Sequence, residues 1–291
     1  MQQYTWEPLT PRLWRIVDAL GVAMYLAVGQ NRASLVDTGY GLAGLRQVVQ
    51  QMTDKPVFVL LTHGHVDHTF GIYEFDEIYL NHLDWKTYQL HADPIFRKSF
   101  LSHSSAPLDQ LTFQPVRAVS FRDVADGQIF DLGGLHLQAV HVPGHTAGMT
   151  MVLLMEERMM LFGDACGPNT MLMEDCSAPI ARYRNSLLRV KTRYEGRYDR
   201  ILRNHGTFES SKDLLDNVLE VCERILTRTD AHQLLPPPMQ TMFPSRHPGR
   251  YLCYSAKPWG HSPAGGPEGS INYREDKSPY FTSTRTIGGT T

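Results

Sequence analysis

The segment Thr62-His63-Gly64-His65-Val66-Asp67-His68 places four side chains that can bind a metal ion within six residues. It directly follows Val57-Phe58-Val59-Leu60-Leu61, a continuous apolar run that is typical of a strand covered on both faces. Polar clusters at the carboxyl end of such a strand are where α/β proteins place ligand sites. Imidazole and carboxylate groups without thiolates suit zinc or another first-row metal. We therefore interpret residues 63–68 as metal ligands rather than as a histidine-bearing surface loop.

The spacing of the four side chains in this segment indicates how they could be shared between two metal ions. If the chain stays extended through residues 63–68, alternate side chains share a face. His63, His65 and Asp67 then converge, whereas His68 points elsewhere. Such an alternation distributes the four side chains between two neighbouring metal ions.

Three further candidate ligands share one context, because each follows an apolar stretch and lies beside a glycine. They are His145 in Pro143-Gly144-His145-Thr146, Asp164 in Phe162-Gly163-Asp164 and His205 in Asn204-His205-Gly206. Glycine lets the backbone turn tightly next to a bound ion. A lone histidine after a strand is more often a surface or core residue, but the ordered recurrence favours one shared site.

Hydrophobic periodicity predicts two blocks of strands, each followed by helices. We expect strands at 13–17, 21–28, 33–36, 57–61, 116–121, 128–132, 135–142, 149–155, 159–162, 198–202, 251–256 and 270–274. We expect helices at 41–52, 180–194 and 209–229, and one or two more within 83–111. The aromatic side chains of this last segment could form an apolar lid over the site, or simply part of the core. They are Trp85, Tyr88, Phe96 and Phe100.

The domain organisation that we expect is one main domain at residues 1–235, with a helical insertion near 83–111. Residues 236–291 are rich in proline and glycine, and we expect them to form a hairpin and an arm on the same domain. This tail could contribute to a homodimer or to the mouth of the site.

Composition excludes several broad classes of protein. Of 291 residues, 42% are apolar and 20% are charged, which excludes general disorder. The 28 basic and 30 acidic side chains give a net charge of −2, which argues against a uniformly basic, polyanion-binding surface. The four cysteines form no CxxC pair, so we expect no disulfide framework. Because neither a signal peptide nor a membrane-length apolar run is evident, we expect a cytoplasmic protein.

Taken together, these motifs resemble those of the metallo-β-lactamase superfamily, over roughly residues 10–230. The set and its order are specific, whereas single members are not. The matching motifs are Asp37-Thr38-Gly39, the HxHxDH run at 63–68, PGHT around His145, GD at Asp164 and NHG around His205. The fold that the resemblance implies is α+β, a four-layer αββα metallo-β-lactamase-like sandwich with a metal site at one edge between two β-sheets.

The resemblance also implies a role for each site residue. The ligands of a first metal ion would be His63, His65 and His145. Those of a second would be Asp67, His68 and His205, and Asp164 would bridge both ions. Asp37 resembles a carboxylate that orients a ligand histidine without touching the metal. The cofactor implied is two Zn²⁺ per chain, with Fe or Mn as other candidates.

Two divalent metal ions about 3.5–4 Å apart can share a hydroxide and lower the pKa of its parent water toward neutrality. We therefore expect a dinuclear zinc-dependent hydrolase, in which the metal-bound hydroxide attacks an ester, lactone or thioester carbonyl of a small molecule. Asp67 could act as a catalytic residue by orienting the nucleophile. Cys166, close after Asp164, is interpreted as a buried neighbour rather than as a nucleophile. Substrate-binding residues stay unassigned.

Substrate classes of the family can be compared with the chain. Glyoxalase-II-like thioesterases usually carry a helical C-terminal domain, which the Pro/Gly-rich tail does not resemble. Lactonases often have a tyrosine soon after the bridging aspartate. Asp164-Ala165-Cys166-Gly167 lacks one, and Tyr183 or Tyr194 could replace it or could simply pack within a helix.

Other functions stay open. One is an iron-dependent oxidoreductase of the same fold, persulfide dioxygenase-like or diiron, although the complete ligand set favours a hydrolase. Another is a phosphodiester hydrolase, since eight basic residues lie between Arg182 and Arg203 and could bind phosphate. A solvated helix face explains the same residues more simply, so we expect no nucleic-acid partner and no membrane partner. A third alternative is a non-catalytic metal-binding scaffold, but such a protein would have no need for coordination positions that protein ligands leave open.

Overall fold

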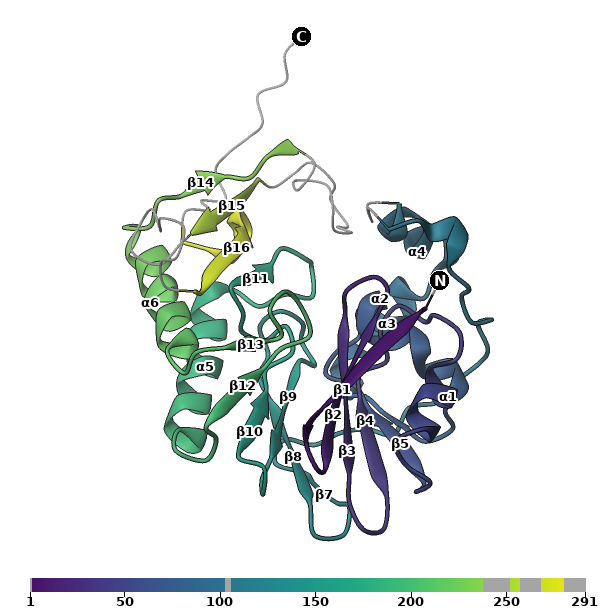
Figure 1. Cartoon of the computed structure of the whole chain (residues 1–291). Helices are drawn as coiled ribbons and strands as arrows, with labels where there is room; N and C mark the ends of the chain where they lie inside the picture. The colour runs from purple at the N-terminus through teal and green to yellow at the C-terminus, as the bar shows by residue number, and fades with distance from the viewer. Residues whose placement is uncertain (1, 103–105, 238–251, 257–267, 280–291) are drawn as a thin grey trace.

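The computed structural model describes residues 2–102, 106–237, 252–256 and 268–279, and its two main sheets lie face to face (Figure 1). The first sheet contains, in spatial order, β1 (Tyr4–Thr10), β2 (Leu13–Asp18), β3 (Ala23–Val28), β4 (Ala33–Val36), β5 (Val57–Leu60) and β6 (Ile78–Tyr79). Its strands are antiparallel from β1 to β4 and parallel from β4 to β6.

The second sheet comes from the second half of the chain. It contains, in spatial order, β13 (Glu209–Ser210), β12 (Arg200–Leu202), β10 (Met159–Leu161), β9 (Thr150–Leu154), β8 (His136–His141) and β7 (Ile129–Asp131). Strands β10 and β12 run parallel, and the other neighbours are antiparallel.

Helices cover the outer face of each sheet. Those of the first half are α1 (Leu45–Gln50), α2 (Val66–Thr69), α3 (Trp85–His91) and α4 (Pro94–Leu101), with 3₁₀ turns at Phe70–Glu74, His82–Asp84 and Leu108–Gln110. Those of the second half are α5 (Ile180–Tyr194) and α6 (Leu214–Thr227). Figure 1 shows α1 and α3 outside the first sheet, and α5 and α6 outside the second. This order of layers is the predicted αββα sandwich.

Alternating side chains connect the layers. Ala23, Tyr25 and Ala27 of β3 pack in the core between the two sheets, whereas Met24 and Leu26 pack in the core under α1. Because successive side chains of a strand point to opposite faces, a single strand contributes to both cores. Because both faces of β3 are buried in apolar cores, its sequence is almost continuously apolar.

A third sheet lies beyond the second, at the top left of Figure 1. It contains, in spatial order, β11 (Asn169–Leu172), β16 (Ser270–Arg274), β15 (Cys253–Ala256) and β14 (Gln233–Leu234). Strands β15 and β16 are antiparallel, as expected for a hairpin, and β16 also pairs in parallel with β11. Ile271 and Tyr273 of β16 pack in the core with α5 and α6. The rest of the expected arm, at 238–251, 257–267 and 280–291, lies outside the described residues.

Several elements differ from those expected. The segment 116–121 forms no strand; a bridge between Tyr79 and Arg122 joins the residue that follows it to the two-residue strand β6. The helix expected at 41–52 is confined to α1, because Gly41 and Gly44 adopt φ angles of 76° and 91°. The helix expected at 209–229 begins only at Leu214, since the preceding residues pair with β12 as β13. Hydrophobic periodicity does not predict β1, because most of its side chains are exposed, or β11, because it is short.

The described helices include none that combines the length and the apolar composition needed to cross a bilayer.

Two neighbouring leucines of α5 offer a test of the packing. Leu187 is fully buried in the core beneath the helix, whereas Leu188 is 38% exposed. We expect Leu187→Ala to lower the free energy of unfolding by about 2–5 kcal/mol, because it leaves a cavity. Leu188→Ala should lower it by less than about 1 kcal/mol. Urea denaturation measures both, and equal losses would contradict the described orientation of α5.

Candidate metal centre

One edge of the two sheets brings together all seven side chains predicted as ligands. From the first half come His63 and His65 after β5, and Asp67 and His68 in α2. From the second half come His145 after β8, Asp164 after β10 and His205 after β12. Their donor atoms form groups whose members all lie within 4.8 Å of one another. These groups are His63, His65 and His145; His63, His68 and Asp164; and Asp67, His68 and His205.

The extended conformation expected across residues 63–68 is wrong, because α2 begins at Val66. The carbonyl oxygen of His65 accepts a 2.9 Å hydrogen bond from Thr69 Oγ1, as well as backbone bonds that close the helical turn. As a result, Asp67 and His68 reach the same partner instead of opposite sides. Asp67 Oδ2 lies 3.4 Å from His205 Nε2, and His68 Nε2 lies 3.2 Å from the same atom.

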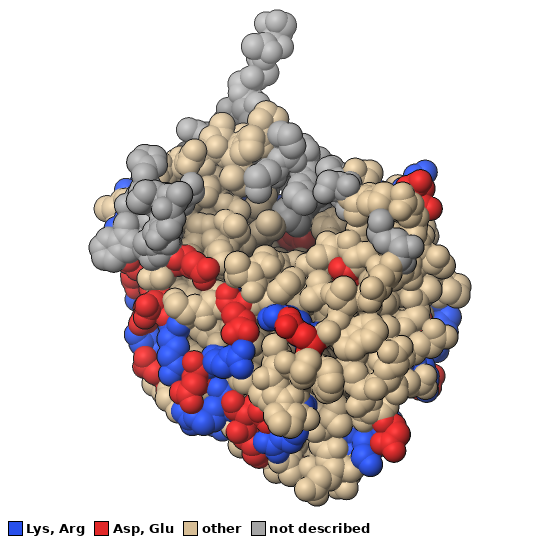
Figure 2. Space-filling model, viewed as in Figure 1, with Lys and Arg blue, Asp and Glu red and all other residues tan. Residues whose placement is uncertain are grey.

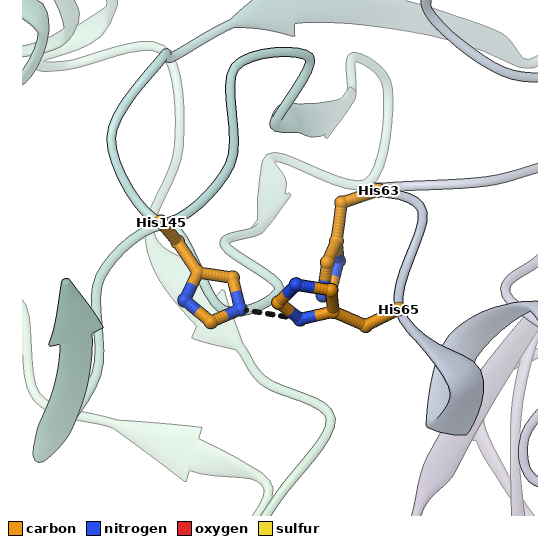
Figure 3. A group of neighbouring side chains, drawn as sticks. All are labelled: His63, His65 and His145. Carbon is orange, nitrogen blue, oxygen red and sulfur yellow. Dashed lines mark hydrogen bonds between the residues drawn. The ribbon is translucent and has the colours of Figure 1, made fainter. Parts of the chain in front are cut away.

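In the first group, His63, His65 and His145 point toward one another (Figure 3). His145 Nδ1 donates a 2.7 Å hydrogen bond to the carbonyl oxygen of Met171, which leaves the lone pair of Nε2 free. That Nε2 lies 3.0 Å from His65 Nδ1. Burial lowers the pKa of His63 well below its ordinary value, and burial together with the charge of His65 lowers the pKa of His145 to about 4.

Asp37 connects the ligands to the fold through four hydrogen bonds. Its Oδ1 accepts from Thr62 N at 2.8 Å, and its Oδ2 accepts from Thr62 Oγ1 at 2.8 Å and from Asn204 Nδ2 at 2.9 Å. Oδ2 also lies 2.9 Å from His68 Nδ1. Because an ionised carboxylate only accepts, His68 Nδ1 must donate, and Nε2 is the nitrogen that turns toward the site. Asp37 therefore contacts His68, one of the candidate ligand histidines.

Asp37 also acts on a second histidine, through Thr62. Since the Thr62 hydroxyl donates to Asp37, its oxygen is available to accept from His63 Nδ1, which lies 3.0 Å away. His63 Nε2 then has no proton, and it is buried without a hydrogen-bond partner among the described residues. A buried acceptor of this kind is costly unless an ion or a donor meets it.

In the second group, carboxylates accompany the imidazoles. Asp164 lies between the two groups, because its Oδ2 is 3.6 Å from His68 Nε2 and 3.8 Å from His145 Nε2, and its Oδ1 is 3.5 Å from His205 Nε2. Burial by itself would lower the pKa of His68, but the charges of Asp67 and Asp164 raise it well above the ordinary value. Burial also opposes the charge of Asp164 at His205, whose pKa is nevertheless raised to about 10.

The donor set fits divalent metal ions. It offers imidazole nitrogens and carboxylate oxygens, the ligands that zinc and its first-row neighbours accept in proteins. His63 belongs to two neighbouring groups, one with His65 and His145 and the other with His68 and Asp164. A cation bound between these imidazole nitrogens and carboxylate oxygens is the simplest explanation of why they lie so close together.

Glycines shape the loops that carry these side chains. Gly163, next to Asp164, has a φ of 56°, a conformation that residues with a Cβ rarely adopt. Gly144, next to His145, instead permits close approach, because a Cβ there would lie 2.2 Å from Cδ2 of Tyr183. The expected tight turns beside the ligands thus have two different physical causes.

The sequence patterns missed three buried side chains around the site. Asp84 accepts from Gly64 N at 2.9 Å, Thr146 Oγ1 at 2.6 Å and Gly148 N at 2.6 Å, and so ties the loop of His65 to the loop of His145. Glu174 and His91 lie behind His65. None of the three belongs to a motif, because the folded chain brings each of them to the site from a distant position.

A pocket of about 570 Å³ opens onto the candidate ligands. This volume lies within the ~300–1,000 Å³ typical of small-molecule sites. Tyr40, Phe100 and Met171 line it beside Asp67 and Asp164. Part of the 83–111 insertion therefore forms a pocket wall, because Phe100 belongs to α4.

Other residues singled out by the sequence lie away from the chemistry. Tyr183 and Tyr194 are buried in the core, and Tyr183 Oη donates to the carbonyl oxygen of Ala165 at 2.6 Å. They do not line the pocket. Cys166 is fully buried, and burial raises the pKa of its thiol, which agrees with its interpretation as a core neighbour.

Several side chains of the basic segment from Arg182 to Arg203 are ion-paired at the surface, whereas Arg203 is buried and lines the pocket. Figure 2 shows basic and acidic side chains interspersed on this side of the molecule. Arg184 pairs with Glu223, Lys191 with Asp216, and Arg200 with Glu209. Such exposed pairs favour the solvated helix face over a phosphate-binding surface.

Comparison with known proteins gives the same family as the motifs. A family model described as the metallo-beta-lactamase superfamily matches residues 17–198, within the stretch that carries the sequence resemblance. An atrochrysone carboxyl ACP thioesterase from Aspergillus chevalieri is 29% identical over 193 residues, or 62% of this chain and 53% of the relative. An acyl-coenzyme A thioesterase from Homo sapiens is 26% identical over 161 residues, or 48% of this chain and 57% of the relative. The chain thus spans about half the length of the curated relatives it matches.

Solved structures agree on the fold. A metallo-beta-lactamase from Pontibacter korlensis superposes with a TM-score of 0.56 and 16% sequence identity, covering 76% of this chain and 99% of that chain. At this identity the likeness shows the fold alone. The αββα sandwich is thus the metallo-beta-lactamase fold.

The hydrogen bond from His63 to Thr62 can be tested with Thr62→Val, which preserves shape but removes the hydroxyl. We expect the affinity for zinc to fall about 10–100-fold, because His63 loses the partner that orients its ring. Competition with a chromogenic chelator measures the affinity. Thr192→Val, which removes an exposed hydroxyl of α5 bonded to the carbonyl oxygen of Leu188, should leave the affinity unchanged. Equal affinities in the two variants would contradict the link through Thr62.

Proposed function

The chain belongs to the metallo-beta-lactamase superfamily, and on that basis we propose that it is a metal-dependent hydrolase of thioesters. The observation that carries the proposal is the convergence of seven imidazole and carboxylate side chains beside a pocket of small-molecule size. The thioester class is supported by the names of the curated relatives, which include an acyl carrier protein thioesterase and an acyl-coenzyme A thioesterase.

We assign the first metal ion to His63, His65 and His145, and the second to Asp67, His68 and His205, with Asp164 between them. Zinc is the ion that this donor set suits best, and the presence of two groups of donors supports two ions. When bound, the ions would supply a water that is deprotonated near neutral pH and a Lewis acid for the carbonyl oxygen.

The residues of the chain then position the reactants. Asp67 lines the pocket, and we assign it to orient the attacking water by accepting a hydrogen bond from it. Tyr40 and Phe100 flank the same pocket, and their ring centroids lie 6.2 Å apart, so they offer an apolar wall to an acyl chain. Hydrolysis adds water across the C–S bond, and a carboxylic acid and a thiol leave the site.

Metal analysis together with an activity assay tests this function. Protein purified without added metal should contain about two zinc ions per chain and should release thiol from acyl-coenzyme A thioesters. Asp164→Ala should lose bound metal and lower kcat/KM on the order of 10²-fold or more, because it removes the carboxylate between the two groups. Asp199→Ala, which removes an exposed carboxylate paired with Arg158, is the control and should change neither quantity.

Two outcomes would overturn the proposal. One is iron near one atom per chain with visible colour, which would favour the oxidoreductase alternative. The other is full metal content and full activity in Asp164→Ala.

The pocket wall can be tested separately. Phe100→Ala should raise KM several-fold for thioesters with long acyl chains while leaving bound metal unchanged, because the ring lines the pocket but offers no metal-binding atom. Ile95→Ala in the same helix removes a side chain that is 80% exposed, and KM should stay at the value of the unmodified protein. If Phe100→Ala altered only stability and KM stayed constant for every acyl chain, α4 would have no role in binding.

A further inference from the structure

We propose that Glu174 is a positioning residue of the metal centre, which holds His65 so that its Nδ1 faces the metal. The proposal rests on the proposed role of His65 as a ligand. It concerns the face of His65 that is turned away from the other candidate ligands. On that face lie the carboxylate of Glu174 and the imidazole ring of His91, neither of which belongs to a sequence motif.

The contacts of Glu174 are short and buried. Its side chain is 6% exposed, its Oε1 lies 3.2 Å from His65 Nε2, and its Oε2 lies 3.5 Å from His91 Nε2. The rings of His65 and His91 stack with centroids 4.4 Å apart and planes inclined by 13°. One carboxylate therefore faces two parallel imidazoles, each through the same type of nitrogen.

Hydrogen bonding decides which nitrogens carry protons. The backbone N–H of Val66 donates to His91 Nδ1 at 3.3 Å, so Nδ1 is an acceptor and the proton of a neutral His91 is on Nε2, facing Glu174. His65 Nε2 and Glu174 Oε1 lie 3.2 Å apart without hydrogen-bond geometry. Because a carboxylate only accepts, a proton on His65 Nε2 is the arrangement that makes this contact attractive. The lone pair of His65 Nδ1 is then free, and it faces His145 Nε2 at 3.0 Å.

This arrangement explains a contact that would otherwise be unfavourable. The Nδ1 proton of His145 is used on the carbonyl oxygen of Met171, so its Nε2 is also a bare acceptor. These two atoms can hydrogen-bond to each other only if His65 Nδ1 carries a proton. When the proton of a neutral His65 is on Nε2, both atoms are bare acceptors at 3.0 Å, and a cation satisfies both. Metal-binding histidines commonly donate their second N–H to a carboxylate or carbonyl, which fixes the ring and makes the nitrogen ligand more basic.

The loop that carries Glu174 is anchored on both ligand histidines. Ser177 Oγ donates to the carbonyl oxygen of His145 at 2.8 Å, and the backbone N–H of Glu174 donates to Ser177 Oγ at 3.2 Å. Residues of and just after β16 secure the same loop. Arg274 Nη1 lies 2.7 Å from Asp175 Oδ1, and Lys277 Nζ donates to the carbonyl oxygen of Ser177 at 2.7 Å.

The same three residues could in principle bind an ion of their own, since their donor atoms also cluster. That would require His65 to give both nitrogens to metals at once and thus to lose both of its ring protons. The positioning role needs only the ordinary neutral ring, so we favour it.

Glu174→Gln tests the proposal, because it keeps the shape of the side chain but removes its charge and one acceptor. We expect one of the two zinc ions to bind about 10–100-fold more weakly in competition with a chelator. The visible absorption spectrum of the Co²⁺-substituted protein should change, since the ring of His65 is no longer held. The melting temperature of the metal-free protein should stay within a few degrees of that of the unmodified protein.

Glu156→Gln is the matched control. Glu156 also contacts a histidine, since its Oε1 lies 2.7 Å from His136 Nδ1, but the pair is partly exposed and is not among the candidate ligands. The control should keep the affinities and the Co²⁺ spectrum of the unmodified protein. If Glu174→Gln fails to fold, Glu174→Asp decides: it retains the charge, so it should fold and bind the first ion with reduced affinity.

Three results would overturn the inference. The first is unchanged affinity and spectrum in Glu174→Gln, or in Glu174→Asp where only that variant folds. The second is a third ion in the unmodified protein that Glu174→Gln loses, which would make these residues a metal site. The third is an unmodified protein that binds no metal, which would overturn the proposed function itself and is distinguishable because it requires no variant.

Discussion

The geometry of the site depends on the hydrogen bonds that the carboxylate of Asp37 accepts. It accepts from the backbone and hydroxyl of Thr62, from His68 and from Asn204, so it joins the end of β5, the helix α2 and the loop after β12. Asp37 itself has a φ of 62°, a conformation that non-glycine residues seldom adopt. The fold thus accepts a strained residue at the point where both sheets meet the ligands.

Around this carboxylate, three of the five candidate ligand histidines are held by the ring nitrogen that faces away from the site. His68 is held by Asp37, His63 by Thr62 and His145 by the carbonyl oxygen of Met171. These partners differ in chemistry, but each leaves the other ring nitrogen to face the site. The carboxylates are distributed unevenly, because Asp67 and Asp164 each lie 3.6 Å from His68 Nε2, whereas the carboxylate beside His65 is that of Glu174. Imidazoles that are easily kept neutral therefore lie beside imidazoles that strongly hold a proton in the absence of metal.

The sequence identifies the seven side chains that the fold brings together, but it does not identify the residues that support them. His63, His65, His145 and the others lie in short motifs at strand ends, and a motif can be recognised locally. Asp84, His91 and Glu174 act through contacts with distant segments, so no local pattern signals them. The error at residues 63–68 has a related cause, since a run of alternating polar residues does not reveal that α2 begins at Val66. Likewise, residues 116–121 have the composition of a strand but lack a neighbouring edge long enough to pair with.

The seven candidate ligands come from both halves of the sandwich, four from the first sheet's side and three from the second. An ion bound there would be held by both halves at once and would act as a crosslink between them. Binding to the folded state alone also stabilises it in proportion to the logarithm of ligand concentration. In the proposed assignment neither half contains a complete set of donors for either ion, so full coordination would require the two halves to be docked.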